Sequence, residues 1–251
     1  MTEPYIFDIR RSSVSDGPGV RTTVFFKGCN LDCFWCHNPE GKESLPQLAV
    51  FREMCISCGA CARFCKNQDH CIKCFGCAEV CPEGARRVYG RKYSDGELLS
   101  AITADKAYYD LTGGGVTFSG GECMLYPEYL ARIAEKCRDE GIAVAVDTAG
   151  CVPFTSFRTV MPYVDLFLYD IKCIDRELHI KGTGRDNLLI LENLDRLLHM
   201  GKRIIVRAPV IPDFNEGAEC EKIAEYCAQR GLSIEFLKYH ELGISKKEAL
   251  S

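Results

Sequence analysis

Short apolar runs alternate with longer amphipathic segments along most of the chain. Residues 20–26 are rich in β-branched and aromatic side chains, which is typical of a buried strand. In residues 127–140, Tyr129, Ile133 and Cys137 recur at a spacing of four, so they share one face of a helix. Strands that alternate with helices in this way predict an α/β fold with a parallel sheet and right-handed crossovers.

Further strands and helices are predicted downstream of residue 94. The strands are expected at residues 116–118, 143–146, 166–169, 203–206 and 233–237. The helices are expected at residues 95–109, 127–140, 187–200 and 218–230. Ser94 or Asp95 is suited to cap the first helix, Pro127 to open the second and Gly141 to end it.

Polar residues or candidate ligands follow each predicted strand. In chain order they are Cys29, Gly120-Gly121-Glu122, Asp147, Asp170, Arg207 and His240. Each of them alone is compatible with a helix cap, but their common register favours an active site at the carboxyl ends of the strands of a barrel. The residues available predict a partial (β/α)6 barrel rather than a barrel of eight strands.

The composition is that of a globular protein without a membrane segment. The 251 residues are 47% hydrophobic and 26% charged, and the formal net charge is −4. This balance argues against nucleic-acid binding, which usually needs a concentrated basic surface. The sequence shows neither a signal-peptide-like apolar region nor an apolar run long enough to span a bilayer. We therefore expect a cytoplasmic protein whose partners are neither nucleic acids nor membranes.

Most of the 17 cysteines lie in the first third of the chain, in runs with metal-ligand spacing. These runs are Cys29-x3-Cys33-x2-Cys36, Cys55-x2-Cys58-x2-Cys61-x3-Cys65 and Cys71-x2-Cys74-x2-Cys77-x3-Cys81. The last two match the bacterial ferredoxin run, in which three cysteines hold one [4Fe–4S] cluster and the fourth ligates the other cluster. The first run supplies only three thiolates, so it would leave one iron of a cubane open to a small molecule, as in a catalytic metal site.

Disulfides and zinc are the alternative explanations for these cysteines. A disulfide framework belongs to an oxidising compartment and does not require a repeated x2-x2-x3 spacing. Pairs of Cys-x2-Cys also bind zinc, but zinc explains neither four cysteines in one run nor the proline after Cys81. We therefore expect residues 52–85 to be a ferredoxin-like insert with two [4Fe–4S] clusters, within a core made of residues 1–51 and 86–251.

Several motifs resemble those of radical S-adenosylmethionine (SAM) enzymes. The cysteine motif, with Trp35 before its last cysteine, resembles the signature of that superfamily. Other segments resemble the activating enzymes of glycyl radical enzymes, the group that includes pyruvate formate-lyase activase. They are DGPGVR at residues 16–21, SGGE at 119–122, DTAG at 147–150, DIK at 170–172, RAPVIP at 207–212 and YHELG at 239–243. The insert resembles the subset that serves dehydratases, decarboxylases, lyases and arylsuccinate synthases.

This resemblance implies a radical SAM barrel with a catalytic cluster and a SAM site. Cys29, Cys33 and Cys36 would hold the cluster, and the amino and carboxylate groups of SAM would chelate its fourth iron. Contacts to SAM are implied for Trp35, Cys36, His37, Asn38, Gly120, Gly121, Glu122, Asp147, Ile171, Lys172, Cys173 and His240. Glu122 would accept hydrogen bonds from the SAM ammonium, and Lys172 would pair with its carboxylate.

The resemblance also implies further sets of site residues. Asp147, Thr148 and Asp170 would form an oxygen-rich pocket for a monovalent cation. Asp16, His37 and Arg207 would lie near the substrate glycine loop, although Asp16 is also suited to cap the Gly-Pro-Gly turn that follows it.

The ferredoxin-like runs imply two auxiliary clusters. The ligands of one would be Cys55, Cys58, Cys61 and Cys81, and those of the other would be Cys65, Cys71, Cys74 and Cys77. These clusters would relay electrons to the catalytic cluster, and a purely structural role is the alternative.

The implied activity is that of an oxidoreductase of anaerobic metabolism. Reductive cleavage of SAM would give a 5′-deoxyadenosyl radical, which takes a hydrogen atom from a glycine Cα of a partner glycyl radical enzyme. A flavodoxin or a ferredoxin-type protein would donate the electron. The implied cofactors are three [4Fe–4S] clusters and SAM, together with the monovalent cation.

Two other functions fit part of the sequence. A radical SAM enzyme that acts on a small molecule or a peptide would also carry auxiliary clusters, but these more often leave one iron open, whereas here the two runs supply every ligand. An electron-transfer ferredoxin fused to an inert barrel is the other alternative. It would have no need of the GGE, DTAG and YHELG segments.

Overall fold

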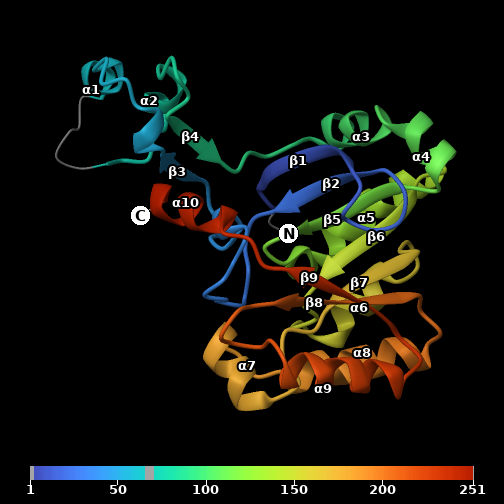
Figure 1. The fold of residues 1–251 in the computed structure, drawn as a ribbon. Coiled ribbons are helices and arrows are strands. Elements are labelled where there is room, and N and C mark those ends of the chain that lie inside the picture. The colour runs from blue at the N-terminus through green and yellow to red at the C-terminus, as the bar shows by residue number, and fades with distance from the viewer. Residues whose placement is uncertain (1–2, 66–70, 251) are drawn as a thin grey trace.

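Parallel strands lie side by side in chain order in the computed structural model, which describes residues 3–65 and 71–250 (Figure 1). They are β2 (Arg21–Phe26), β5 (Gly115–Gly120), β6 (Ala143–Thr148), β7 (Leu166–Asp170), β8 (Ile204–Val210) and β9 (Ser233–Lys238). A further strand, β1 (Ile6–Ser13), pairs antiparallel with β2 and completes a seven-stranded sheet. Within the described residues β1 and β9 are its edges, so the sheet is open. The predicted α/β fold with a parallel sheet is confirmed.

Helices connect consecutive parallel strands and cover the sheet. They are α3 (Asp95–Thr103), α4 (Lys106–Thr112), α5 (Pro127–Asp139), α6 (Phe154–Val160), α7 (Arg176–Thr183), α8 (Leu188–His199) and α9 (Ala218–Ala228), with α10 (Leu242–Ala249) after β9. Helix α3 begins with a capping box, in which Ser94 and Glu97 each accept a hydrogen bond from the other's backbone N–H. Among the described residues, no helix combines the length and the apolar character that a membrane crossing requires.

The cysteine-rich segment lies apart from the main sheet. Its helices α1 (Ala60–Phe64) and α2 (Gly76–Glu79) lie near β3 (Gln47–Val50) and β4 (Arg86–Tyr89), which form a separate antiparallel pair. Figure 1 shows this group at the upper left, with α10 beside β3. Val50 pairs with Arg86, so the two ends of the segment leave the core side by side.

The helix expected at residues 95–109 is instead two helices, α3 and α4, with a break at Ala104 and Asp105. The buried Asp105 carboxylate points toward the sheet, where it accepts hydrogen bonds from Arg11 and, at 3.0 Å, from Thr22 Oγ1. The backbone of Asp105 is not helical (φ −105°, ψ 10°), so the helix is interrupted where this side chain is bonded to the sheet. The sequence pattern also does not predict β1, the β3–β4 pair, α6 or α7. Helices α6 and α7 have seven and eight residues, which is too short to show a clear period.

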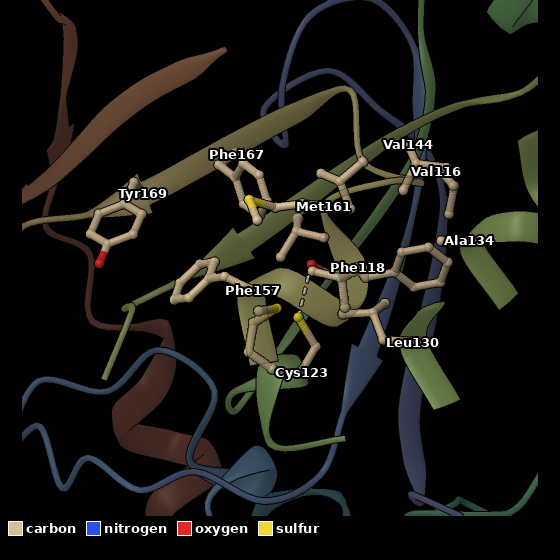
Figure 2. Close-up of a cluster of buried hydrophobic side chains, with 14 of the residues drawn as sticks. Val116, Phe118, Cys123, Leu130, Ala134, Val144, Phe157, Met161, Phe167 and Tyr169 are labelled. Carbon is tan, nitrogen blue, oxygen red and sulfur yellow. Dashed lines mark hydrogen bonds between the residues drawn. The ribbon is translucent and has the colours of Figure 1, made fainter. Parts of the chain in front are cut away.

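The largest hydrophobic core packs one face of the sheet against α3, α5, α6, α8 and α9, and Figure 2 shows the part of it at α5 and α6. Phe118 of β5 and Phe167 of β7 enter it from the sheet, and Leu130 of α5 and Phe157 of α6 enter it from the helices. The ring centroids of Phe157 and Phe167 are 5.8 Å apart. Because this core fixes one face of the sheet, it also fixes the relative positions of the strand ends.

Replacing Leu130 with alanine should lower the free energy of unfolding by about 2–5 kcal/mol, because this fully buried side chain would leave a cavity. Leu111→Ala is the matched control, because the Leu111 side chain is 82% exposed and its loss should change the free energy by less than about 0.5 kcal/mol. Urea denaturation under anaerobic conditions, followed by circular dichroism, measures both changes. Equal losses in the two variants would contradict the assigned core.

Candidate active site

A cavity of about 750 Å³ opens at the carboxyl ends of the parallel strands. Each parallel strand contributes to it, through Cys29 after β2, Gly120 of β5, Asp147 of β6, Asp170 of β7, Arg207 of β8 and His240 after β9. The structure therefore brings together the strand-end residues that the sequence pattern singles out, except for Glu122. The volume lies within the range of about 300–1,000 Å³ that is usual for small-molecule sites.

The cysteines of the first run line this cavity. Cys33 is buried, and Cys29 and Cys36 are partly buried. Burial raises the pKa of Cys29 to about 12 and that of Cys33 to about 11, so metal binding would have to displace these protons. No three ligand-type side chains in the described ranges converge on a single metal ion. A cubane does not require such convergence, because each thiolate binds a different iron.

Main-chain hydrogen bonds hold the cysteine loop against the sheet. The N–H of Gly28 donates to the Gly41 carbonyl at 2.8 Å, and the Gly28 carbonyl accepts from the Glu122 N–H at 2.7 Å. The Gly121 N–H donates to the Phe26 carbonyl at 2.8 Å. A Cβ at Gly121 would collide with the carbonyl oxygens of Gly28 and Gly41. Gly121, predicted to let SAM approach the backbone, is therefore also needed to pack the GGE turn against the cysteine loop.

Most of the residues predicted to contact SAM line the cavity. They are Trp35, Cys36, His37, Asn38, Gly120, Gly121, Asp147, Lys172 and His240. Ile171 and Cys173 do not belong to the lining; each is 1% exposed, and Ile171 is part of the hydrophobic core. In residues 170–173, the structure therefore presents Asp170 and Lys172 to the cavity, whereas Ile171 and Cys173 are buried outside its lining.

Glu122 does not line the cavity, in contrast to the prediction that it binds the SAM ammonium. Its buried carboxylate accepts hydrogen bonds from Thr148 Oγ1 at 2.8 Å and from the N–H groups of Ala149 at 3.0 Å and Met124 at 3.1 Å. Burial raises the pKa of this carboxyl to about 7. In this structure Glu122 therefore ties the loop after β5 to the end of β6. The motif gives the residue type but not the direction of the side chain.

Charged side chains form pairs along the cavity wall. Lys172 Nζ donates to Asp170 at 2.8 Å, and Arg207 Nη1 lies 3.5 Å from Asp147 Oδ1. Burial opposes the charge of Lys172, but Asp170 together with the nearby Cys33 and Cys29 outweighs this effect and raises the pKa of the lysine. Within the described chain, Asp147 Oδ1, Arg207 Nε and His37 Nε2 are buried without a hydrogen-bond partner. Because such atoms are rarely left unsatisfied, they are suited to contact a polar ligand.

The residues predicted to bind a monovalent cation, Asp147, Thr148 and Asp170, all line the cavity. Thr148 Oγ1 already donates to Glu122 and accepts from the Gly150 N–H, and Asp170 pairs with Lys172. Asp147 Oδ1 accepts no hydrogen bond within the described residues, but it lies 3.5 Å from Arg207 Nη1, so a cation bound there would share this oxygen with the arginine.

The residues predicted to face the substrate glycine loop, Asp16, His37 and Arg207, also line the cavity. Asp16 accepts hydrogen bonds from Ser13 Oγ at 2.6 Å and from Thr23 Oγ1 at 2.7 Å. The Asp16 carboxylate therefore holds the turn before β2 and also belongs to a residue that lines the cavity. Its position is compatible both with capping of the turn and with a place near the substrate glycine loop.

Two histidines stack at the cavity wall. The rings of His37 and His240 are 4.0 Å apart between centroids and inclined by 17°. Burial lowers the pKa of His37 to about 4, so its ring is neutral near pH 7. Helix α10 supports this wall, because Lys246 Nζ pairs with the buried Glu40 at 2.5 Å and also lies 3.5 Å from the His37 carbonyl. No motif in the sequence points to Lys246, which is notable there only because it follows the YHELG segment by three residues.

The insert contains a second, smaller cavity of about 70 Å³. Its lining includes Cys55, Cys58, Cys61 and Cys81, which are the residues predicted to bind one auxiliary cluster. Of the other predicted set, Cys71 and Cys74 are exposed, and Cys65 and Cys77 are partly buried. In that part of the insert, the ring of Phe64 packs so closely on Gly76 that a Cβ there would collide with it.

Comparison with known proteins identifies the family. Residues 15–158 match a family described as "4Fe-4S single cluster domain". The chain is 37% identical to the trans-4-hydroxy-L-proline dehydratase activating enzyme of Clostridioides difficile, over 98% of this chain and 88% of that one. It is 34% identical to the benzylsuccinate synthase activating enzyme of Thauera aromatica, over 98% and 81% of the two chains. The chain belongs to the glycyl-radical-enzyme activating enzymes.

Solved structures with low sequence identity share the fold of this activating enzyme. Streptococcus suis SuiB bound to the precursor peptide SuiA aligns with a TM-score of 0.56 at 12% identity, over 89% of this chain and 39% of that one. The protein anSMEcpe with bound AdoMet aligns with a TM-score of 0.51 at 15% identity, over 86% and 49% of the two chains. These alignments support the mixed α/β fold.

The buried carboxyl of Glu122 should make the stability of the activating enzyme depend on pH. Its pKa rises from the ordinary 4.5 to about 7 on folding, so the folded state keeps a proton that the unfolded state releases. The free energy of unfolding should therefore fall by up to about 3 kcal/mol as the pH rises from about 4.5 to 7. Burial also raises the pKa of Asp147, to about 6. Ionisation of Asp147 should therefore also lower the free energy of unfolding, at a lower pH than ionisation of Glu122 does.

Glu122→Gln should remove most of the decline between about pH 6 and 7, because Asp147, with a pKa of about 6, is more than half ionised above pH 6 and contributes little there. Glu128→Gln, at an exposed position, should keep the decline of the unaltered protein. Urea midpoints measured at a series of pH values compare the variants. The same decline in Glu122→Gln as in the unaltered protein would show that Glu122 does not keep its proton on folding.

Proposed function

We propose that this activating enzyme binds a [4Fe–4S] cluster through Cys29, Cys33 and Cys36, binds SAM in the adjoining cavity, and generates a radical on a glycine of a partner glycyl radical enzyme. The observation that carries the proposal is that one cavity collects these three thiols and the charged ends of the parallel strands. When bound, the cluster and SAM supply the chemistry, which is one-electron cleavage of SAM followed by removal of a hydrogen atom from the glycine Cα.

The residues of the chain bind and orient the reactants rather than transfer protons. Lys172 provides a fixed positive charge for the SAM carboxylate, because Asp170 holds its ammonium group in place at 2.8 Å. His240 offers a ring face to the adenine, and Asp147 Oδ1 is available to the SAM ammonium or to a monovalent cation shared with Thr148 and Asp170. We expect the bound reactants to displace water from the cavity.

The substrate glycine is proposed to enter beside Asp16, His37 and Arg207. Arg207 Nη2 donates to the Ser15 carbonyl at 3.4 Å, so this arginine connects β8 to the loop before β2. Its Nε has no hydrogen-bond partner within the described residues and is therefore suited to donate to a carbonyl of an incoming peptide loop. The activating enzymes to which the chain is similar serve dehydratases, lyases, a decarboxylase and a synthase, and we expect the partner to belong to this range.

Residues 52–85 are proposed to form a ferredoxin-like insert with two further [4Fe–4S] clusters. The arrangement of Cys55, Cys58, Cys61 and Cys81 around one cavity supports the ligand set of the first cluster. Cys65, Cys71, Cys74 and Cys77 are then left for the second. Their exposure suits electron entry from a flavodoxin or a ferredoxin-type donor, so we favour a relay over a structural role. All the cysteines are free thiols, which agrees with a reducing cytoplasm.

Anaerobically reconstituted protein should contain about twelve irons, as three cubanes of four, and should convert SAM to 5′-deoxyadenosine on reduction. Cys36→Ala should lower the iron content to about eight and abolish SAM cleavage, because the cubane with the open iron loses a ligand. Cys220→Ala, a thiol outside the three runs, is the matched control and should retain both properties. Iron analysis and chromatography of the nucleoside products measure these outcomes. Zinc in place of iron, or SAM cleavage by Cys36→Ala, would refute the proposal.

A further inference from the structure

Arg86 lies between the two sets of cysteines in the insert. It begins β4, five residues after Cys81, and its side chain lines the 70 Å³ cavity together with Cys61 and Cys81. Its Nη1 donates to Cys77 Sγ at 3.8 Å, and its side chain lies beside Cys61 in the lining of the small cavity. Cys61 and Cys77 belong to different predicted clusters, so one cation contacts ligands of both.

The Arg86 side chain is held from two directions. It lies beside Cys61 and Cys81 in the lining of the small cavity, and its hydrogen bond to Cys77 Sγ reaches toward the other set of cysteines. An arginine keeps its positive charge throughout the pH range in which proteins are folded.

Strand geometry explains why the side chain of Arg86 faces the cysteines and that of Arg87 does not. Successive side chains of a strand point to opposite faces. The Arg87 side chain is exposed; its Nε donates to the Gly84 carbonyl at 2.8 Å, and its guanidinium carbon lies 5.1 Å from the centre of the Phe51 ring. Arg87 is thus a residue of the same type, one position away, whose side-chain hydrogen bonds within the described residues go to Gly84 and Met54 rather than to a cysteine.

We propose that Arg86 is a positioning residue that raises the reduction potentials of both auxiliary clusters by holding one positive charge between Cys61 and Cys77. This inference rests on the two-cluster insert proposed above. Each cubane would take one electron from a low-potential donor and so gain one negative charge. A nearby cation stabilises that reduced form, and hydrogen bonds to cluster sulfur atoms act in the same direction. Arg86 would thereby favour electron entry into the insert.

The test uses the full chain with Cys29, Cys33 and Cys36 replaced by alanine, so that only the auxiliary clusters contribute. Iron analysis and redox titration followed by electron paramagnetic resonance are applied to this parent and to its Arg86→Gln and Arg87→Gln forms. At a fixed potential, Arg86→Gln should lower the ratio of reduced to oxidised cluster about tenfold for both clusters, which corresponds to about 59 mV for a one-electron couple. Arg87→Gln should stay within about twofold of the parent.

Each outcome decides between the two proposals. Fewer than about eight irons in the parent would refute the two-cluster insert, and this inference with it. Eight irons with equal potentials in Arg86→Gln and Arg87→Gln would refute only the role of Arg86. If Arg86→Gln does not retain iron, Arg86→Lys and Arg87→Lys replace the glutamine variants. A lysine has a single ammonium group, so Arg86→Lys should lower the potential of one cluster and keep that of the other. Equal potentials in the two lysine variants would refute the inference.

Discussion

The close approach of three backbone segments underlies the whole site. The loop after β2, the turn at η1 (Pro39–Gly41) and the loop after β5 meet through main-chain hydrogen bonds that involve Gly28, Gly41 and Gly121. A side chain at Gly121 would occupy the space of the Gly28 and Gly41 carbonyl oxygens, and one at Gly28 or Gly41 would collide with the side chain of Tyr126 or Phe7. Backbone geometry thus sets the position of the cysteine loop. Because this loop packs against the ends of the strands, the strands also determine where the thiols lie.

Buried polar groups extend this junction across the sheet. Glu122 connects the loop after β5 to Thr148 and Ala149 at the end of β6, although its carboxylate gives no surface to the cavity. On the other side, Lys246 of α10 reaches Glu40 next to the cysteine loop. These interactions hold the walls of the cavity in fixed positions. Asp147 Oδ1, on a residue that lines the cavity, has no hydrogen-bond partner within the described residues.

The sequence predicts the parallel strands and the residues at their ends, because apolar runs and the residues that follow them are local features. It does not predict β1, whose place depends on pairing with β2, or the break before α4, which depends on the tertiary contacts of Asp105. The same limit applies to the site. A motif places Glu122 beside two glycines, but only the folded chain shows that its carboxylate turns inward to Thr148.

The stacked imidazole rings of His37 and His240 restrict how a purine can be bound. At 4.0 Å between centroids the rings are already in van der Waals contact, and no third aromatic ring can intercalate between them. A purine that uses His240 must therefore lie on its outer face and extend the stack. His37 covers the inner face of the His240 ring. The stack with His37 thereby fixes the plane of the His240 ring, and with it the plane in which a nucleoside would lie.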